Sequence, residues 1–453
     1  MTSLGHAMAA LDKLLPMHVE GRVATLRGAT LLAEGLPLPV GTVVRVHPTL
    51  SGGQPQEGEI IGFAGDETIV MLMGRPEGIR PGDPICAAHA GASIGAGEGL
   101  LGRVIDAMGR AFDDRPDPAE AAMAPLDAAR IGPLVREPIA TPLRTGVRAI
   151  DLVTPIGRGQ RMGIFAGPGV GKSTLLGQIT RHSDAQIIVV ALIGERGREV
   201  REFVEDSLGE EGLARSVVVC ATADDSPLMR ARAARSACAI AEHFRDEGCD
   251  VLLVMDSLTR YAHALRQIGL AAGEPPTSRG YTPSVFAALA QLLERAGAVG
   301  LPDGRVGSIT GLYTVLVEGD DFNEPISDAV RGILDGHLEL SRELANRGHF
   351  PAIDVLGSVS RLATKLMDPT HAASRMQVQR VLAARREAED LIRIGAYTRG
   401  SSREVDAALE LEPRLDALLR QPPDAAEPFD SALEQFVRLG VDIGQLLAAE
   451  RRG

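Results

Sequence analysis

Apolar and polar residues alternate in short stretches along the first part of the chain, and Gly or Pro interrupts them about every eight to twelve residues. The stretches of this kind are residues 18–25, 41–46, 59–63 and 68–72. Because alternation turns every second side chain to the same face of a strand, the pattern predicts a small β-barrel. An amphipathic stretch from Leu4 to Leu15 precedes it and is expected either to dock on a partner or to stay a disordered terminus.

The pattern changes between about residues 93 and 361, where apolar runs without a polar face alternate with helical segments. These runs are residues 187–193, 216–219, 251–255 and 308–317. A strand that is apolar on both faces is typical of a parallel sheet with helices on both sides. This part of the chain therefore predicts an α/β domain.

Helical periodicity dominates after Ser360. The helical segments are residues 376–394, 405–419 and 428–449, with a proline-containing linker at 421–424. The three patterns together predict an N-terminal segment and β-barrel domain over 1–92, an α/β domain over 93–361 and a C-terminal helical domain over 362–453.

Length and charge agree with a multidomain enzyme. At roughly 150 residues per domain, 453 residues correspond to about three domains. The formal net charge of −13 argues against a generally basic, nucleic-acid-binding surface. The Arg-rich segment from Arg380 to Arg386 is interpreted as a solvated helix face, with a nucleic-acid patch as the alternative.

Cysteine usage and hydropathy suggest a cellular location. The four cysteines lie far apart without a CxxC pair, so free buried thiols in a reducing compartment are expected. The sequence has no run of 18 consecutive apolar residues and no export signal. A cytoplasmic protein is therefore expected, and docking on a membrane complex remains compatible with this.

One segment of the α/β part carries a specific chemical signature between an apolar strand, 162–165, and a helix that continues over 175–179. It consists of Ala166, Gly167, Pro168, Gly169, Val170, Gly171, Lys172, Ser173 and Thr174. Glycines let backbone N–H groups converge on phosphate oxygens, and the following helix directs its positive end at the same anion. Lys172 is expected to reach the β- and γ-phosphates, and the Ser173 hydroxyl is expected to bind Mg²⁺.

The first position of this loop departs from the strict pattern, which has Gly where this chain has Ala166. Alanine is small, so the departure weakens the match only slightly. The alternative is a glycine turn that merely caps a helix, but the strand before it and the helix after it favour phosphate binding. The sequence therefore predicts a protein that binds a nucleoside triphosphate.

Three further residues are candidates for hydrolysis. Asp256 follows a core strand, where a carboxylate can hold Mg²⁺ through its water shell. Glu195 follows another core strand and is the candidate for polarising the attacking water; alternatively, it pairs with Arg196 or Arg198. Arg361 is a candidate arginine finger for the γ-phosphate of a neighbouring subunit, and the alternative is a surface arginine at a domain junction.

Longer motifs carry a family resemblance. The segment from Pro351 to Ser360 resembles the signature of the rotary-ATPase catalytic and regulatory subunits, a RecA-like hexameric family. Other motifs resemble the protein-export branch of that family: residues 193–203, 255–261, 273–276, 279–281, 283–286, 313–321 and 333–337. Within this branch the chain resembles the flagellar type III export ATPases, with the injectisome secretion ATPases as close relatives. The resemblance extends from about residue 21 to residue 400 and weakens at both ends.

The resemblance implies a RecA-like P-loop core and a role for each matching residue. Lys172 and Ser173 would hold the phosphates and the metal. Glu195 would be the catalytic carboxylate, with Arg196 beside it in the same motif and also a catalytic candidate. Asp256 would support Mg²⁺. The implied cofactors are thus ATP and Mg²⁺.

The resemblance also implies a base pocket and a ring. In this family an aromatic residue just before the Pro-Ala-x-Asp motif stacks on adenine, and Phe350 takes that position, where tyrosine is usual. Stacking is retained and a hydroxyl group is lost. Tyr397 is a second candidate for the base pocket, with core packing as its alternative. Arg361 would act in trans, so each active site would be completed by the next protomer of a homohexamer.

The leading expectation for function is ATP hydrolysis that energises type III export of flagellar proteins across the cytoplasmic membrane. The implied partners are export-apparatus regulator and stalk proteins, membrane proteins of the export gate, and chaperone–cargo complexes. The protein would associate peripherally with the inner face of the cytoplasmic membrane and would bind no specific nucleic acid.

Four alternatives are weighed against this expectation. An injectisome ATPase has the same chemistry, and only Arg201, Glu202 and residues 395–397 favour the flagellar member. The catalytic subunit of a rotary ATP synthase is disfavoured by the motif at 256–260. An RNA translocase needs exposed aromatic residues on a basic barrel, where this chain offers essentially Phe63. A non-catalytic nucleotide-binding module is disfavoured by the catalytic candidate carboxylate after the core strand.

Overall fold

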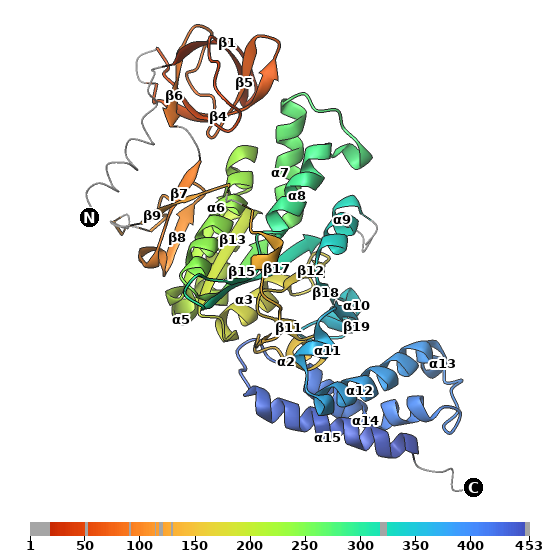
Figure 1. Ribbon diagram of the computed structural model, residues 1–453. Coiled ribbons are helices and arrows are strands. Elements are labelled where there is room, and N and C mark those ends of the chain that lie inside the picture. The colour runs from red at the N-terminus through yellow and green to blue at the C-terminus, as the bar shows by residue number, and fades with distance from the viewer. Residues whose placement is uncertain are drawn as a thin grey trace.

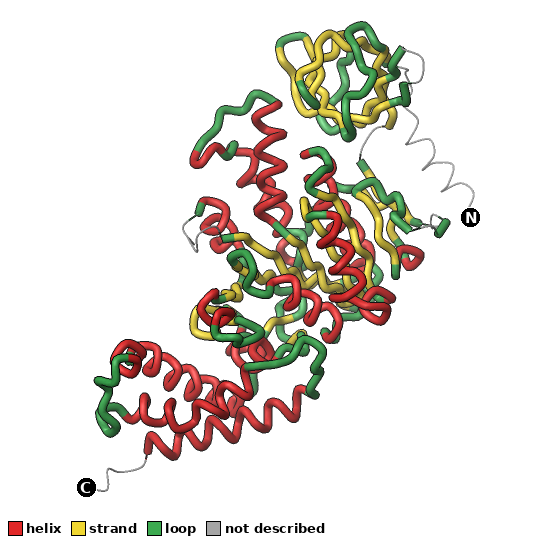
Figure 2. Tube along the Cα trace, turned by 180° about the vertical axis from the view of Figure 1, so that it is seen from behind, coloured by secondary structure: helices red, strands yellow, loops and turns green. Residues whose placement is uncertain are grey.

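The computed structural model describes residues 19–49, 53–89, 92–113, 115–116, 121–127, 130–317 and 324–448. The stretch from Leu4 to Leu15 and the end of the motif at 313–321 lie outside the described residues. A β-barrel, an α/β region and a helical region follow one another along the long axis of the molecule (Figure 1). The view from behind shows the same order, with strands at one end and helices at the other (Figure 2).

Six antiparallel strands close into the barrel in the order β1-β2-β5-β4-β3-β6. They are β1 (Glu20–Arg27), β2 (Thr30–Glu34), β3 (Val43–Val46), β4 (Gln56–Ala64), β5 (Glu67–Leu72) and β6 (Pro84–His89). The barrel core contains Val23, Leu31, Val44, Ile60 and Val70 from five different strands. This confirms the predicted barrel.

Two barrel strands were not foreseen in the sequence. β2 follows β1 after a two-residue turn, in which Gly28 adopts a φ of 63° that favours glycine. β6 has the sequence Pro-Ile-Cys-Ala-Ala-His, in which small residues obscure the alternation of apolar and polar positions. Its backbone pairs with both β1 and β3, so tertiary pairing rather than a local pattern makes it a strand.

The α/β region is built on a nine-stranded sheet of order β19-β18-β12-β17-β15-β13-β14-β8, with β16 paired to β17 beside this path. The strands are β8 (Arg103–Asp106), β12 (Arg161–Ala166), β13 (Ile187–Glu195), β14 (Ser216–Thr222), β15 (Asp250–Asp256), β16 (Gly297–Gly300), β17 (Val306–Leu316), β18 (Gly336–Leu340) and β19 (Ile353–Ser360). All neighbouring pairs are parallel except β18 with β19 and β16 with β17. Two smaller sheets pair β7 (Ser93–Ala96) with β9 (Ala122–Pro125), and β10 (Pro142–Leu143) with β11 (Ile156–Gly157).

Helices cover both faces of this sheet (Figure 1). They are α2 (Arg148–Val153), α3 (Lys172–His182), α4 (Gly197–Glu202), the π-helix η3 (Phe203–Leu208), α5 (Gly209–Ala214), α6 (Pro227–Asp246), α7 (Leu258–Ala271), α8 (Pro283–Leu293), α9 (Pro325–Ile333), α10 (Arg342–Asn346) and α11 (Ala363–Leu366). Short 3₁₀ turns are η1 (Glu98–Leu100), η2 (Pro133–Val135) and η4 (Ser278–Gly280). In β13, Val189 and Ala191 belong to one core, and Ile188 and Val190 to the other. Burial on both faces explains the continuous apolar runs and confirms the parallel α/β core.

The C-terminal region contains α12 (Pro369–Glu387), α13 (Glu389–Arg393), α14 (Arg403–Leu419) and α15 (Phe429–Ala448). The helix expected over 376–394 is two helices, and the first begins earlier than expected. Asp368 caps α12, because its carboxylate accepts hydrogen bonds from the N–H groups of Thr370 and His371. Pro369 then occupies the first helical position, where its missing N–H costs nothing.

The helical region shares a core with one face of the sheet. Val378, Leu411 and Phe436 belong to the same buried cluster as Ile164 of β12. The short helix α2 lies between them and contacts α12, α14 and α15. The predicted linker at 421–424 does separate α14 from α15, as the pattern indicated.

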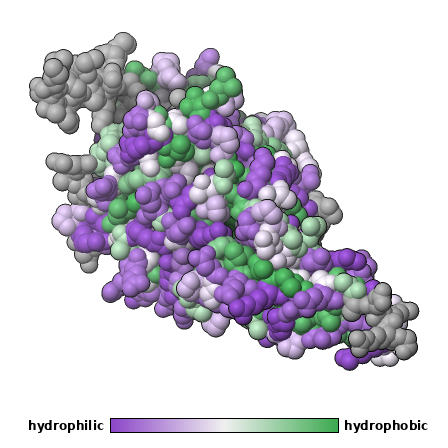
Figure 3. Space-filling model, turned by 60° about the horizontal axis from the view of Figure 1, so that its bottom comes forward, coloured by the Kyte–Doolittle hydropathy of each residue, from purple (hydrophilic) through white to green (hydrophobic). Residues whose placement is uncertain are grey.

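The surface of the helical region is mixed. Hydrophilic residues dominate the face in Figure 3, with apolar residues gathered in smaller patches. In the Arg-rich segment, Arg380 pairs with Glu404 at 2.7 Å, and Arg385 pairs with Glu412. The segment is therefore an ion-paired, partly solvated helix face, in which each exposed pair contributes about 0–1 kcal/mol. None of the described helices has both the length and the apolar character that a membrane span requires.

The four cysteines are free, as expected. Cys220 and Cys238 are buried, and burial raises the pKa of each thiol to about 12. Cys86 and Cys249 are partly buried. The two buried thiols therefore stay protonated and unreactive at neutral pH.

Replacing Phe436 by Ala should lower the free energy of unfolding of the C-terminal helices by about 3–5 kcal/mol, because the buried ring would leave a cavity. Val441 on the same helix is 51% exposed, so Val441→Ala serves as the control and should change this free energy by no more than about 0.5 kcal/mol. Native-state hydrogen exchange of the α15 amides measures both. Equal losses in the two variants would contradict this assignment of the core.

Candidate active site

The glycine-rich loop lies between the carboxyl end of β12 and the start of α3 at Lys172. Gly169 and Gly171 have φ angles of 77° and 88°, in the left-handed region that favours glycine. Ser173 and Thr174 are exposed in the first turn of α3, where backbone N–H groups have no partner within the helix. The loop thus presents donors and a helix N-terminus to one space, which is the geometry that binds phosphate.

Four charged side chains meet beside this loop. Lys172 Nζ forms an ion pair with Asp256 Oδ1 and lies 4.0 Å from Glu195 Oε1. Arg260 on α7 places its Nε 3.1 Å from Glu195 Oε1, and its Nη2 donates to Oε2 at 3.2 Å. Thr314 on β17 donates its hydroxyl to Asp256 Oδ1 at 2.7 Å. Because the parallel strands end at the same edge, the sheet brings together the three charged residues that the sequence predicted for the site, Lys172, Glu195 and Asp256.

The arginines that follow Glu195 in the chain point elsewhere. Arg196 pairs with Glu199 at 3.4 Å, and its side chain is 79% exposed. Arg198 pairs with Glu202 at 3.2 Å on the surface of α4. Glu195 therefore pairs with neither Arg196 nor Arg198, the two arginines that the sequence analysis considered as its partners. Its arginine partner is Arg260 instead. A catalytic role for Arg196 stays a prediction.

The environment of Glu195 moves the pKa of its carboxyl group close to neutral pH. Burial, and next the negative charge of Asp256, raise the pKa of Glu195 to about 7, while Lys172 and Arg260 oppose the rise. A general base works best with a pKa close to the working pH. Glu195 Oε1 is also buried and accepts no hydrogen bond from the described residues. This oxygen is therefore free to accept a hydrogen bond from a water molecule.

The donor set fits Mg²⁺. A serine hydroxyl and a carboxylate are hard oxygen ligands, and Mg²⁺ is usually held by one or two such groups together with water and substrate phosphates. Ser173 is exposed at the start of α3, and Asp256 is 4% exposed at the end of β15. Glu195 Oε1 adds a buried acceptor on the same side that has no hydrogen bond from the described residues, and a metal-bound water would be a suitable donor to it. No cluster of three or more His, Cys, Asp or Glu that could form a self-contained metal site occurs among the described residues.

Phe350 lies against the phosphate loop. A Cβ added to Gly171 would come within 3.4 Å of the Phe350 ring, and this ring is 43% exposed. The linker reaches the same place, because Gln421 N donates to the Phe350 carbonyl at 2.9 Å. Gln178 of α3 in turn donates to the carbonyl of Pro422 at 3.5 Å. An exposed aromatic face beside the loop is available for stacking on a base.

Tyr397 occupies a different place from the one expected. Its hydroxyl lies 3.0 Å from the carbonyl of Ser402 and 3.0 Å from Asp406 Oδ1, within the connection between α13 and α14. Among the described residues, Tyr397 forms no hydrogen bond or ring contact with Phe350 or the phosphate loop. The structure therefore does not bring the two aromatic candidates together.

Arg361 lies at the edge of the sheet where β12 begins, whereas the phosphate loop lies where β12 ends. Arg361 follows β19, whose Ser360 pairs with Gly336 at the start of β18. Because β18 runs parallel to β12, this position is opposite to the phosphate loop. Arg361 is exposed, and within the described part of the chain its side chain has no hydrogen bond or ion pair. It is therefore available to a neighbouring molecule.

Sequence reasoning missed three contributors to this site: Arg260, Thr314 and Gln421. Arg260 lies in the quoted motif at 255–261, four residues after Asp256, which would have placed it one helical turn beyond the sheet edge. The other two have no local signal, because one comes from a separate strand and the other from the linker.

Comparison with known proteins identifies the family. Residues 146–360 match the nucleotide-binding domain of the ATP synthase alpha/beta family, and residues 367–438 match the T3SS EscN ATPase C-terminal domain. A flagellum-specific ATP synthase of Pseudomonas aeruginosa is 49% identical over 411 residues, which cover 90% of each chain. The chain belongs to the ATP synthase alpha/beta family. This ATPase also shares 45% identity with a type 3 secretion system ATPase of Xanthomonas euvesicatoria, over 91% of this chain and 92% of the relative.

Solved structures agree with this assignment. The assembled ATPase EscN from the type III secretion system of enteropathogenic E. coli superposes with a TM-score of 0.85 at 40% identity, covering 93% of this chain and 100% of that one. EscN in complex with its central stalk EscO gives a TM-score of 0.84. The fold class and the family resemblance predicted from the motifs are confirmed.

Ionised Glu195 is the form that can accept a proton, so kcat/KM for ATP, which reports the nucleotide-free enzyme, should rise with pH through an apparent pKa near 7 and level off above it. Glu195→Gln should remove this inflection and lower kcat about 10²–10⁴-fold, with ATP binding retained. Steady-state ATPase assays across the neutral range and equilibrium nucleotide binding measure these effects. A loss of less than about tenfold would assign Glu195 a structural role instead.

Proposed function

We propose that this ATPase hydrolyses MgATP to energise type III export of flagellar proteins across the cytoplasmic membrane. The observation that carries the proposal is the convergence of the phosphate loop with a buried, proton-exchanging carboxylate at one edge of the sheet. The flagellum-specific relatives, at 44–49% identity, support the cellular assignment.

The chemistry follows from the placement of the side chains. Lys172 leaves its carboxylate partners to hold the β- and γ-phosphates, assisted by the N–H groups of the loop. Ser173 and Asp256 would hold Mg²⁺, which would neutralise developing charge on the phosphate oxygens. Glu195 Oε1 would orient the attacking water and take up its proton while the water oxygen bonds to the γ-phosphorus and the bond from that phosphorus to ADP breaks. Arg260 keeps this carboxylate in place through its ion pair.

Phe350 completes the nucleotide site in this proposal. Its exposed ring face lies next to Gly171 and is positioned to stack on the adenine. Tyr397 is not required for this, since its hydroxyl is engaged between α13 and α14.

A ring explains the position of Arg361. An exposed arginine at the edge opposite its own phosphate loop cannot serve that loop, but it can reach the γ-phosphate of an adjacent protomer. We therefore propose a homohexamer in which each active site takes Arg361 from the next subunit. The assembled state of EscN supports this arrangement.

The proposed partners follow from the export assignment. A stalk protein is supported by the complex of EscN with EscO, and regulator proteins, export-gate membrane proteins and chaperone–cargo complexes complete the set. The protein is proposed to work in the cytoplasm at the inner face of the membrane.

Two alternative functions are less well supported. For an RNA translocase, Phe63 is the one exposed large aromatic among the described barrel residues, and the Arg-rich helix α12 is paired with carboxylates. For a rotary ATP synthase subunit, the match of residues 367–438 to the EscN C-terminal domain points to the secretion branch instead.

If Arg361 completes a neighbour's site, ATPase activity should rise more than linearly with protein concentration as rings assemble. Arg361→Ala should lower turnover about 10³-fold or more, the scale of arginine fingers acting in trans. Arg438→Ala is the matched control, since Arg438 is a surface residue of α15 paired only with Glu434 in the described residues. Strict proportionality between rate and concentration from dilute protein upward would contradict the ring site.

Glu195→Gln introduced at the chromosomal locus should abolish or sharply reduce secreted flagellin and swimming motility, because export would lose its energy source. Glu205→Gln, on the exposed surface of η3, is the control and should leave both unchanged. Retained ATP binding by the purified Glu195 variant confirms that it folds. Normal motility in a flagellated strain would move the assignment to an injectisome or another translocase.

A further inference from the structure

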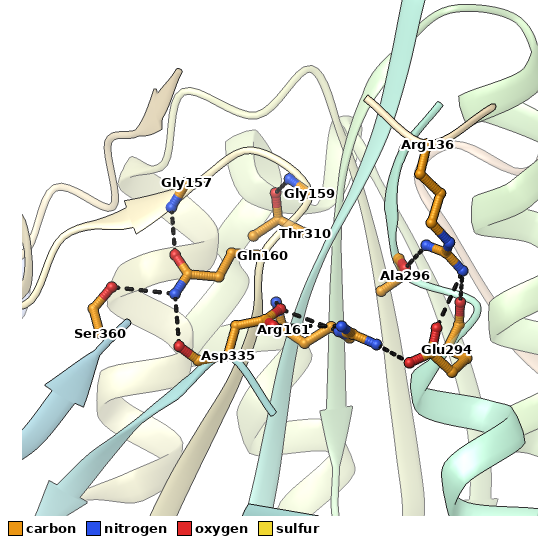
Figure 4. A network of polar contacts seen from close by, with 10 residues as sticks. All are labelled: Arg136, Gly157, Gly159, Gln160, Arg161, Glu294, Ala296, Thr310, Asp335 and Ser360. Carbon is orange, nitrogen blue, oxygen red and sulfur yellow. Dashed lines mark hydrogen bonds and ion pairs between the residues drawn. The ribbon is translucent and has the colours of Figure 1, made fainter. Parts of the chain in front are cut away.

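Gln160 is a buried polar residue in the turn that precedes β12, far from the phosphate loop. Its side-chain oxygen accepts a hydrogen bond from Gly157 N at 2.8 Å. Its side-chain nitrogen donates to the Asp335 carbonyl at 3.2 Å and to Ser360 Oγ at 3.1 Å (Figure 4). One carboxamide thus joins three segments of the chain: the β11–β12 turn, the start of β18 and the end of β19.

The Asp335 carbonyl connects Gln160 to Arg361. The same oxygen that accepts from Gln160 also accepts from Arg361 N at 3.0 Å. A carbonyl has two lone pairs, so both bonds form together. The backbone of Arg361 and the side chain of Gln160 are therefore held at a common atom, and Ser360 adds a second link one residue earlier.

Asp335 is itself held firmly. Its carboxylate accepts from Arg161 N at 3.0 Å and from Arg161 Nε at 3.1 Å, and Asp335 N donates to the Arg161 carbonyl at 2.9 Å. Arg161 also pairs with Glu294, whose carbonyl accepts from Arg136 (Figure 4). These bonds hold the Asp335 carbonyl, which accepts the hydrogen bond from Arg361 N, in place relative to β12.

β19 needs such an anchor because it is the last strand of the sheet and pairs with β18 alone. The β18–β19 pairing also contains an irregularity between His337 and Glu339. This irregularity separates the last two pairs, His337 with Val359 and Gly336 with Ser360, from the rest of the ladder, so the end of β19 has few ladder partners of its own. Gln160, in the turn that leads into β12, adds a constraint from outside this ladder.

We propose that Gln160 is a positioning residue for Arg361 and sets the geometry of the arginine finger that each protomer offers to its neighbour. The inference rests on the proposed action of Arg361 in trans. It concerns the subunit that donates the finger, because β12 spans about 20 Å between Gln160 and the phosphate loop of its own subunit.

The variant Gln160→Met keeps the size of the side chain but removes the donor to Asp335 and Ser360. In the homogeneous protein, kcat should fall about tenfold to a hundredfold, the cost of misplacing a reacting group by about 1 Å, with nucleotide binding within about twofold. Thr310→Val is the matched control. Thr310 on β17 is buried, and its hydroxyl accepts from Gly159 N, in the same turn as Gln160, at 2.9 Å. Among the described residues it has no side-chain hydrogen bond to Asp335 or Ser360. Loss of the Thr310 hydroxyl should leave kcat within about threefold of the value for the unchanged protein.

Mixed rings decide whether Gln160 acts through Arg361. One chain carries Lys172→Ala and supplies only the finger; the other carries Arg361→Ala and supplies only the phosphate loop. The two chains are co-expressed with different tags, and rings that contain both are purified. Gln160→Met should lower ATPase activity when placed on the finger-supplying chain and leave it unchanged on the other chain.

Each outcome has a defined meaning. An equal loss for both placements assigns Gln160 to general stability, and no loss for either placement removes it from the reaction; both overturn the inference. An inactive parental pair, without any change at Gln160, instead shows that Arg361 does not act in trans and overturns the ring site together with this inference. If Gln160→Met does not fold, Ser360→Ala removes one acceptor of the same carboxamide and should show the same asymmetry with a loss of about threefold to tenfold.

Discussion

The buried cluster of two carboxylates and two cations at the carboxyl edge of the sheet is the interaction on which the active site depends. Burying a carboxylate costs free energy that only a close cation or hydrogen bond can offset. Asp256 meets this cost with Lys172 and Thr314, and Glu195 meets it with Arg260. These contacts form before any nucleotide is present, so the fold tolerates both carboxylates in a partly desolvated place.

This arrangement also changes when a triphosphate arrives. Lys172 now stabilises both carboxylates, and phosphate oxygens compete for the same ammonium group. In the mechanism that we propose, Lys172 turns to the nucleotide, and Glu195 then loses one of the two cations that hold down its pKa. Its affinity for a proton therefore increases in the state in which a water molecule must be deprotonated. Arg260 prevents the carboxylate from moving away, because its guanidinium touches both carboxylate oxygens.

Local patterns were sufficient to predict the sheet and three of the four charged side chains that meet at its carboxyl edge. A strand buried on both faces must be apolar throughout, and a phosphate loop needs glycines at positive φ, so β13 and residues 166–174 carry visible signals. Glu195 and Asp256 were found because both directly follow such strands. Arg260 was missed although its spacing of four residues from Asp256 places it one helical turn beyond the same edge. Thr314 comes from a separate strand, and no spacing in the sequence encodes its distance from Asp256.

For Tyr397 the sequence left both a base pocket and core packing open. An aromatic residue in a motif-like segment suggested a base pocket, but the hydroxyl of Tyr397 is used locally beside Asp406. The linker lies next to Phe350 instead. Its two prolines predict that the helices are interrupted there, but they do not predict which residues the linker contacts. Composition can predict that a segment is irregular, but the residues that this segment contacts depend on long-range packing.

The docking of this linker ties the helical region to the nucleotide site. Gln421 accepts from Arg148 N at 2.9 Å, donates to the Gly146 carbonyl at 2.8 Å, and is bonded through its own N–H to Phe350. These partners belong to the sheet side of the molecule, while the linker continues directly into α15. Any displacement of the C-terminal helices relative to the sheet must therefore break these buried hydrogen bonds or move Phe350 with it. A force applied to the helical region thus reaches Phe350 through the hydrogen bond from Gln421 N, without passing through the phosphate loop.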